Sequence, residues 1–351
     1  MNRETRRQHF LPRFLLKGFA SRSRRDSHFI HVFQKSRAPH ETNTINVAVV
    51  GDFYGRGADS SVENGLRERE REHAAVLDRI RMEGLIDENR IVLGEFVRQL
   101  LVRTRHMRDL TVDVVATLSV MMAGLLRTPQ AQEHLKQEIS ERALRDETFW
   151  AKVRTLGLNF TEQQMKYLVD WAMTQIDVPS IAHQHAEALA MMDILGAVTA
   201  GQIGGLRRAI AERPVLPDDV VWSLIKTEPH FLILGDLAVI GRTADGYSHP
   251  MQPDAGLQAI LLPIGHQHLL VGALTSMQRT LNPEEVNLAS VELSRDFFLS
   301  SRNTERERQY HARLGARAQF SGLFEMLTQI AMESFRGELR SGSETRKSPL
   351  P

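Results

Sequence analysis

The stretch SSVENGLREREREHAAVLDRIRM, residues 60–82, marks a change from strand-rich to helical sequence. Ser60 and Glu63 have the spacing of a capping box, in which two side chains satisfy backbone N–H groups at the start of a helix. The Arg and Glu residues that follow form oppositely charged pairs three and four positions apart, which stabilise a solvated helix. The stretch therefore predicts a long helix from Ser60 to about Met82.

Helical patterns continue through the middle of the chain. Thr128 followed by Pro129 is typical of an N-cap with proline at the first helical position. Thr161 and Gln164 repeat the capping-box spacing. The further helices that we expect cover residues 91–107, 110–127, 130–145, 162–176, 182–195 and 203–212.

Strand-forming sequence flanks this helical middle on both sides. The expected strands are 28–34 and 45–50 upstream, and 220–226, 230–235, 238–240, 258–264 and 268–272 downstream. A cap followed by proline, Asn282-Pro283, predicts a helix to about Ser300, and another helix is expected over 304–335. We predict an α+β fold in which a helical central bundle stands beside small β-rich segments from the two ends, and these segments pair with each other.

The same patterns divide the chain into five segments. They are a basic, aromatic β segment (1–58), a helical region (59–213), a β-rich segment with its following helix (214–303), a C-terminal helix (304–336) and a disordered tail (337–351).

Composition excludes several classes of protein. The 351 residues carry 44 Lys and Arg against 43 Asp and Glu, a net charge of +1, which excludes a globally basic nucleic-acid coat protein. The absence of Cys excludes thiolate zinc sites, iron–sulfur clusters and a cysteine nucleophile. Charge is nevertheless uneven, because residues 1–40 hold ten basic and two acidic side chains. Seven of the 22 aromatic residues fall in the first 54 positions, so we expect this basic region to fold.

The chain shows no apolar core of a signal peptide near its first residue. Its longest apolar run, Leu110 to Leu126, contains Asp113 and is shorter than the roughly 20 residues that span a membrane. We expect this run to be a buried helix and the protein to be cytoplasmic, without membrane contact.

Known catalytic motifs are missing from the sequence. It contains no phosphate-binding P-loop, no dinucleotide-binding glycine loop, no Gly-x-Ser-x-Gly elbow and no His-Glu-x-x-His. It also lacks the Glu-x-Lys or Asp-x-Lys triplet of a standard restriction-type nuclease core.

Three of the residue groups that can carry chemistry supply most of the site residues that we predict. His9 can act as a general base or metal ligand, and Arg13 and Lys17, four residues apart, can share a helical face and hold a phosphate. Glu63 and Glu70 lie two helical turns apart, about 10 Å along the backbone, which is long for joint metal binding. Each group also has a structural interpretation, since apolar residues around His9 can anchor the N-terminal segment and Glu63 can serve only as a cap.

The third group is Gly235-Asp236, which follows the apolar run Phe231–Leu234. A carboxylate at the end of a strand is a frequent catalytic placement, because loops there often carry function. Aspartate is equally a common turn residue.

The opening QHFLPRFLLKGF, residues 8–19, resembles the QHYVPQFYLKNF-like start of the bacterial domain-of-unknown-function family 4238. Further similarities follow in the same order up to about residue 303, including Leu126-Arg127-Thr128-Pro129 and the region from Trp222 to Asp236. Where the family has Ser-Asp-Asn-Pro, this chain has Gly235-Asp236-Leu237-Ala238, so only the aspartate is shared.

The resemblance implies no activity, but it draws attention to particular positions. The ionisable residues that the family pattern emphasises are His9, Arg13, Glu63, Glu70, Arg127 and Asp236. Side chains scattered along a chain often converge in one active-site cleft.

Our first hypothesis is a bacterial enzyme, a metal-dependent nuclease or phosphoesterase linked to defence against phage or to mobile elements. His9 would be the base or a metal ligand, and Arg13, Lys17 and Arg127 would contact phosphate. The oxygen ligands of a Mg²⁺ or Mn²⁺ ion would come from Glu63, Glu70 and Asp236.

Two other interpretations remain open. One is a non-catalytic module that binds nucleic acid or a protein through the basic N-terminal surface, with salt-sensitive affinity for nucleic acid. The other is that the emphasised residues are structural and join the N-terminal segment to the C-terminal β segment through buried ion pairs.

Overall fold

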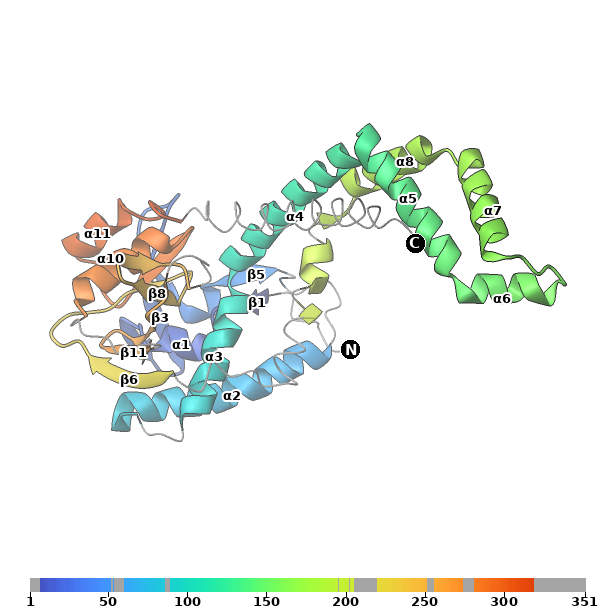
Figure 1. The fold of residues 1–351 in the computed structure, drawn as a ribbon. Helices are drawn as coiled ribbons and strands as arrows, with labels where there is room; N and C mark the ends of the chain where they lie inside the picture. Colours follow the sequence, from blue (N-terminus) through green and yellow to red (C-terminus); the bar gives the residue numbers. More distant parts are fainter. Residues whose placement is uncertain are drawn as a thin grey trace, which may run out of the picture. The chain divides into compact units, whose positions relative to one another are not determined.

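Helices and antiparallel strands share the chain, which confirms the α+β prediction (Figure 1). The computed structural model describes residues 7–51, 53, 60–85, 89–194, 196–201, 203–204, 220–250, 256–273 and 281–318. The expected helix at 203–212, most of the expected C-terminal helix and the tail at 337–351 lie largely or wholly outside these residues. The described chain forms two compact units, one from residues up to 112 and from 196 onward, the other from residues 113–194.

Three antiparallel arrangements of strands belong to the first unit. The largest orders β6 (Val221–Lys226), β11 (His268–Ala273), β10 (Ala259–Gly265), β8 (Ile240–Thr243) and β9 (Gly246–Ser248). β10 is buried along its whole length, as expected for a central strand with neighbours on both sides. A short pair joins β1 (Arg7–His9) to β5 (Val49–Gly51), with His9 opposite Val49.

The other five-stranded sheet unites the two ends of the described sequence, as predicted. Its order is β2 (Arg22–Arg24), β3 (Ser27–Gln34), β12 (Phe297–Ser300) and β7 (Leu234–Gly235), and β4 (His40–Asn43) also pairs with β3. Phe33 of β3 stacks on Phe298 of β12 with ring centroids 4.6 Å apart. A short 3-10 helix at Thr44–Asn46 replaces part of the strand expected at 45–50.

One expected helix is shorter than predicted. α10 (Pro283–Leu293) begins as expected, since the Asn282 side chain accepts a hydrogen bond from the Glu284 N–H. It ends at Leu293, and residues 297–300 form β12 instead of the predicted end of the helix. These residues gain a complete strand partner in β3, more than 260 positions earlier, which a local pattern cannot reveal. α11 (Glu305–His311) follows with a capping box between Thr304 and Glu307.

The predicted long helix is present as α2 (Ser60–Glu83), and it packs against α3 (Arg90–Arg103). The following helix, α4 (Arg105–Leu126), begins earlier than predicted. Thr104 has an extended backbone that ends α3, and its hydroxyl accepts a hydrogen bond from the Met107 N–H, which starts α4.

The second unit is helical throughout its described part. Its helices after α4 are α5 (Pro129–Arg145), α6 (Glu147–Thr155), α7 (Glu162–Gln175) and α8 (Val178–Ala190). α5 packs against α7 and α8 around buried Trp150, Val169, Met173 and Val178. The caps predicted at Thr128 and Thr161 are formed. α6 was not predicted, although Asp146 caps it by accepting a hydrogen bond from the Phe149 N–H.

α4 differs from the buried helix that we expected. The helix starts at Arg105, five residues before the apolar run, so its 22 residues exceed the length that the run alone suggested. Among the described residues it is the only helix that is long and apolar enough to cross a membrane, judged by length and composition alone. In its most apolar 18-residue stretch, 12 % of the residues are buried. The expectations of a cytoplasmic location and of no membrane contact are not tested by this finding.

Candidate functional site

The N-terminal motif places His9 at the end of a strand and Arg13 at the start of a helix. Pro12 has an extended backbone and precedes α1 (Arg13–Lys17), whose Leu15 and Leu16 are fully buried. Gly18 follows the helix because a side chain there would meet the backbone: a Cβ atom would lie 2.5 Å from the carbonyl oxygen of Ile264. The apolar positions thus anchor the segment, and Arg13 and Lys17 remain exposed.

His9 has a free nitrogen in a largely enclosed place. Its Nε2 atom is buried and has no hydrogen-bond partner among the described residues. Burial lowers the pKa of His9 from its ordinary value of 6.5, and the positive charges of Arg13 and Arg103 lower it further. A backbone hydrogen bond with Thr44 and the charge of Glu70 act in the opposite direction. The imidazole is therefore mainly neutral at pH 7 and able to accept a proton at Nε2.

Glu70 and Arg103 form the ion pair next to this histidine. The Arg103 Nη1 atom lies 2.8 Å from Oε1 of Glu70, and Arg103 Nη2 donates a 2.9 Å hydrogen bond to the carbonyl oxygen of His9. The side chain of Arg103 is 4 % exposed and that of Glu70 is 30 % exposed. A single guanidinium therefore ties α3, α2 and β1 together.

A second histidine lies one turn further along α2. His73 is 1 % exposed, and neither of its ring nitrogens has a hydrogen-bond partner among the described residues. Its ring packs against Phe96 of α3, with centroids 5.1 Å apart. Burial lowers the pKa of His73 to about 4, and the charges of Arg103 and Arg69 contribute to this shift. We call His9, Arg13, Glu70, His73 and Arg103 the His9 site.

A further polar layer supports the site between α2 and α3. Arg69 lies 3.4 Å from a carboxylate oxygen of Glu95, which is 2 % exposed, and 3.2 Å from Glu72. Burial raises the pKa of the Glu95 carboxyl, an effect that the charge of Arg69 partly offsets. Buried charges of this kind persist only when they are paired, so these contacts hold the helix pair in one register.

The structure brings three of the seven sequence-predicted residues into one site. His9, Arg13 and Glu70 lie together, since the charges of both other residues act on His9. Lys17 lies one turn beyond Arg13 on α1. Glu63 lies on α2 seven positions before Glu70, but its side chain is outside the described residues. Arg127 is exposed at the end of α4, in the second unit.

Asp236, the remaining predicted metal ligand, accepts hydrogen bonds from three backbone N–H groups. Its Oδ1 atom accepts a hydrogen bond from the N–H of Arg295, at 3.0 Å, and its Oδ2 atom accepts from Asp296, at 2.6 Å, and Phe297, at 3.2 Å. Burial raises the pKa of Asp236 to about 6, and the three backbone donors limit the shift. Both oxygens hold the turn that leads from α10 into β12, so we leave Asp236 out of the His9 site.

The expected metal site receives no support from the donor set. Among residues whose side chains are described, no group of three or more His, Asp or Glu is close enough to hold a metal ion. His9 and Glu70 supply two candidate ligands, and a third would have to come from a side chain outside the described set, such as Glu63.

The sequence analysis missed His73, Arg103 and Glu95. A signal for two of them is present on α3, where Glu95, Gln99 and Arg103 recur every fourth residue among apolar neighbours. Residues with this spacing share one helical face. Polar residues on a face that is otherwise apolar indicate either a buried ion-pair network or a site.

Comparison with known proteins establishes the family. A match to the family described as "Protein of unknown function (DUF4238)" covers residues 7–319. The chain belongs to the DUF4238 family. The DUF4238 match includes every residue of the His9 site and carries no activity with it. No curated protein and no solved structure matches the chain.

Replacing Arg103 with methionine is expected to lower the free energy of unfolding of this DUF4238 protein by about 2 kcal/mol. The substitution removes the ion pair with Glu70 and leaves a partly buried carboxylate without its cationic partner. The matched control is Arg142→Met, whose ion pair with Glu138 is largely exposed and should be worth less than about 0.5 kcal/mol. Urea unfolding of the two variants measures the difference. Equal stabilities would show that the Arg103 pair does not hold the helices together.

Proposed function

We propose that this protein is a phosphodiesterase acting on nucleic acid, with His9 as the general base. The observation that carries the proposal is the free, buried Nε2 atom of a neutral His9 flanked by cationic Arg13 and Arg103. A neutral imidazole can remove a proton from an attacking water, and positive charge attracts the anionic substrate. Such an enzyme would suit the defence or mobile-element context expected from the sequence.

The remaining residues have distinct roles in this proposal. Arg13 is exposed and has no carboxylate partner among the described residues, so its guanidinium is available to a phosphate. Arg103 is largely occupied by Glu70 and the His9 carbonyl, so it positions the base. The Mg²⁺ or Mn²⁺ ion expected from the sequence would take Glu70 as an oxygen ligand.

A cleavage assay on the full chain tests this function. The substrates are single- and double-stranded DNA and RNA, each with Mg²⁺, Mn²⁺ or EDTA. We expect cleavage that falls at least 100-fold in His9→Ala, which is the usual contribution of a general base. The rate should also fall as the pH drops below the lowered pKa of His9, since protonation removes the base.

The matched control is His40→Ala, which changes an exposed histidine on β4 and should retain full activity. Melting temperatures of both variants establish that they are folded. A folded wild-type protein that cleaves none of the substrates would contradict the proposed function. Salt-sensitive binding without cleavage, unchanged by His9→Ala, would instead support the non-catalytic binding module.

A further inference from the structure

The end of α1 opposite the His9 site touches a second group of aromatic and basic side chains. The carbonyl oxygen of Gly18 accepts a 2.9 Å hydrogen bond from the backbone N–H of His266 and lies 3.0 Å from Nδ1 of that ring. α1 has five residues, so its two ends are about 7 Å apart at 1.5 Å per residue. Lys17 is exposed at this end, one turn beyond Arg13.

From His266 the contacts continue through an aromatic stack. The ring of Phe231 lies nearly parallel to that of His266, at 13° and 5.3 Å between centroids. The guanidinium carbon of Arg302 lies 3.1 Å from the centroid of the Phe231 ring. We call His266, Phe231 and Arg302 the Arg302 stack.

Arg302 has unused hydrogen-bonding capacity. It is exposed, and its guanidinium has neither a carboxylate partner nor a hydrogen-bond acceptor among the described residues. The cation–π contact limits the orientation of the guanidinium plane while leaving its five N–H donors free. A planar cation held in this way is suited to a phosphate group, which it can bind through two parallel hydrogen bonds.

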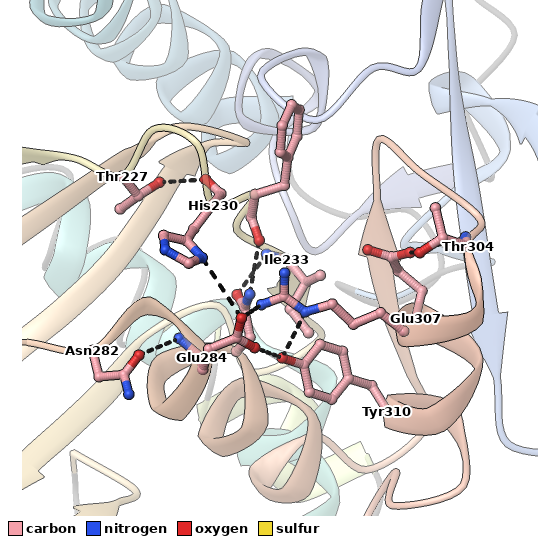
Figure 2. Close-up of polar contacts among 11 residues, drawn as sticks. Thr227, His230, Ile233, Asn282, Glu284, Thr304, Glu307 and Tyr310 are labelled. Atoms are coloured by element: carbon pink, nitrogen blue, oxygen red, sulfur yellow. Dashed lines mark hydrogen bonds and ion pairs between the residues drawn. The ribbon is translucent and has the colours of Figure 1, made fainter.

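Glu284, which contacts His230 beside Phe231 in the chain, already has polar partners, as Figure 2 shows. Glu284 accepts a 2.6 Å hydrogen bond from the Tyr310 hydroxyl and forms an ion pair with Arg306. His230 precedes Phe231 in the chain, and its Nδ1 atom lies 3.6 Å from Glu284. The backbone of His230 is held by Thr227, whose hydroxyl donates to the His230 carbonyl at 2.9 Å. Because Glu284 is paired, this carboxylate does not compete with a phosphate for Lys17 or Arg302.

We propose that Lys17 and the Arg302 stack guide a single strand of nucleic acid toward the His9 site. Lys17 and Arg302 would bind backbone phosphates, and a base would stack on the outer face of the Arg302 guanidinium, which lies over the Phe231 ring. A single strand fits better than a duplex, because its bases are free to stack on aromatic rings and guanidinium planes. This inference rests on the proposed function, since it assigns a substrate class to the same site.

The test is the fluorescence anisotropy of labelled 20-nucleotide DNA and RNA strands and of the matching duplexes. It is done in the His9→Ala background, so that cleavage does not interfere. We expect Arg302→Ala to weaken single-strand binding about tenfold and to lower the salt slope by about one. Arg302→Lys keeps the positive charge but loses the planar contact with Phe231. Its affinity for a single strand should therefore lie between that of the Arg302 protein and that of Arg302→Ala.

Arg142→Ala is the matched control, because it removes one exposed positive charge from the second unit. Binding that is equal in Arg302→Ala and Arg142→Ala would overturn this inference, and so would a preference for duplex. Neither result would affect His9-dependent cleavage, so the proposed function would stand. Conversely, Arg302-dependent binding by a protein that never cleaves would overturn the proposed function and support the binding surface.

Discussion

Replacing Asp236 with alanine is expected to lower the free energy of unfolding by about 4 kcal/mol. The substitution leaves the N–H groups of Arg295, Asp296 and Phe297 without their acceptor at a site where the side chain is 5 % exposed. A buried donor without a partner costs about 1–3 kcal/mol. The substitution also destabilises the sheet that contains β3, β12 and β7, because Phe297 is the first residue of β12, which lies between the other two strands.

Two further variants make the Asp236 experiment decisive. Asp236→Asn retains one acceptor oxygen and should lose about half as much stability as Asp236→Ala. Asp26→Ala, at an exposed turn between β2 and β3, should change stability by less than about 0.5 kcal/mol. Chemical denaturation of the three variants measures these differences. An Asp236→Ala variant as stable as the wild type but without activity would support the catalytic interpretation of this carboxylate instead.

Replacing His73 with leucine is expected to protect the protein against acid. The folded state holds this histidine with a pKa of about 4, against an ordinary value of 6.5 in the unfolded chain. Between these values the unfolded state binds more protons, so the stability contributed by the neutral ring is complete above pH 6.5 and is lost as the pH falls toward 4. We take the free energy of unfolding of the leucine variant minus that of the wild type. Relative to its value at pH 7, this difference should rise by about 2 kcal/mol at pH 5 and by about 3 kcal/mol at pH 4.

The comparison between variant and wild type is needed because other buried groups titrate over the same range. Burial also lowers the pKa of His106 to about 4 and that of His249 to about 3, which adds to the acid sensitivity. Asp236 acts in the opposite direction, since its raised pKa favours the protonated folded state below about pH 6. Thermal melts of both proteins at pH 7, 5 and 4 give the difference. A difference that stays constant with pH would show that the pKa of His73 is the same in the folded and unfolded states, and would contradict the buried neutral ring.

Local sequence patterns were sufficient for most of the helices. The caps at Ser60, Thr128 and Thr161 predicted α2, α5 and α7 to within about one residue, because capping depends on neighbours three positions away. Long-range pairing was beyond such patterns. Residues 297–300 continue a helical pattern locally but form β12, since pairing with β3 and β7 satisfies their backbone groups better.

In the candidate site, too, some residues follow from local sequence patterns and others only from tertiary packing. The N-terminal motif singled out His9 and Arg13, and the acidic spacing on α2 singled out Glu70. The position of Arg103 beside them and the burial of His73 against Phe96 depend on how α3 packs against α2 and β1, which the spacing along either helix does not contain. The role of Asp236 was equally open, since an aspartate after a strand suits both a turn and a catalytic site.

By itself, the sequence determined the α+β class and the long helices, because these follow from periodicity, caps and local composition. The opening motif supplied the resemblance to the family that the match over residues 7–319 established. Only the tertiary structure decided that Asp236 holds a turn and that His9 shares its site with Arg103 and His73. It also decided that Arg302 has no acidic partner among the described residues. These properties depend on burial and on charges brought together from distant positions, and neither is encoded in the spacing of neighbouring residues.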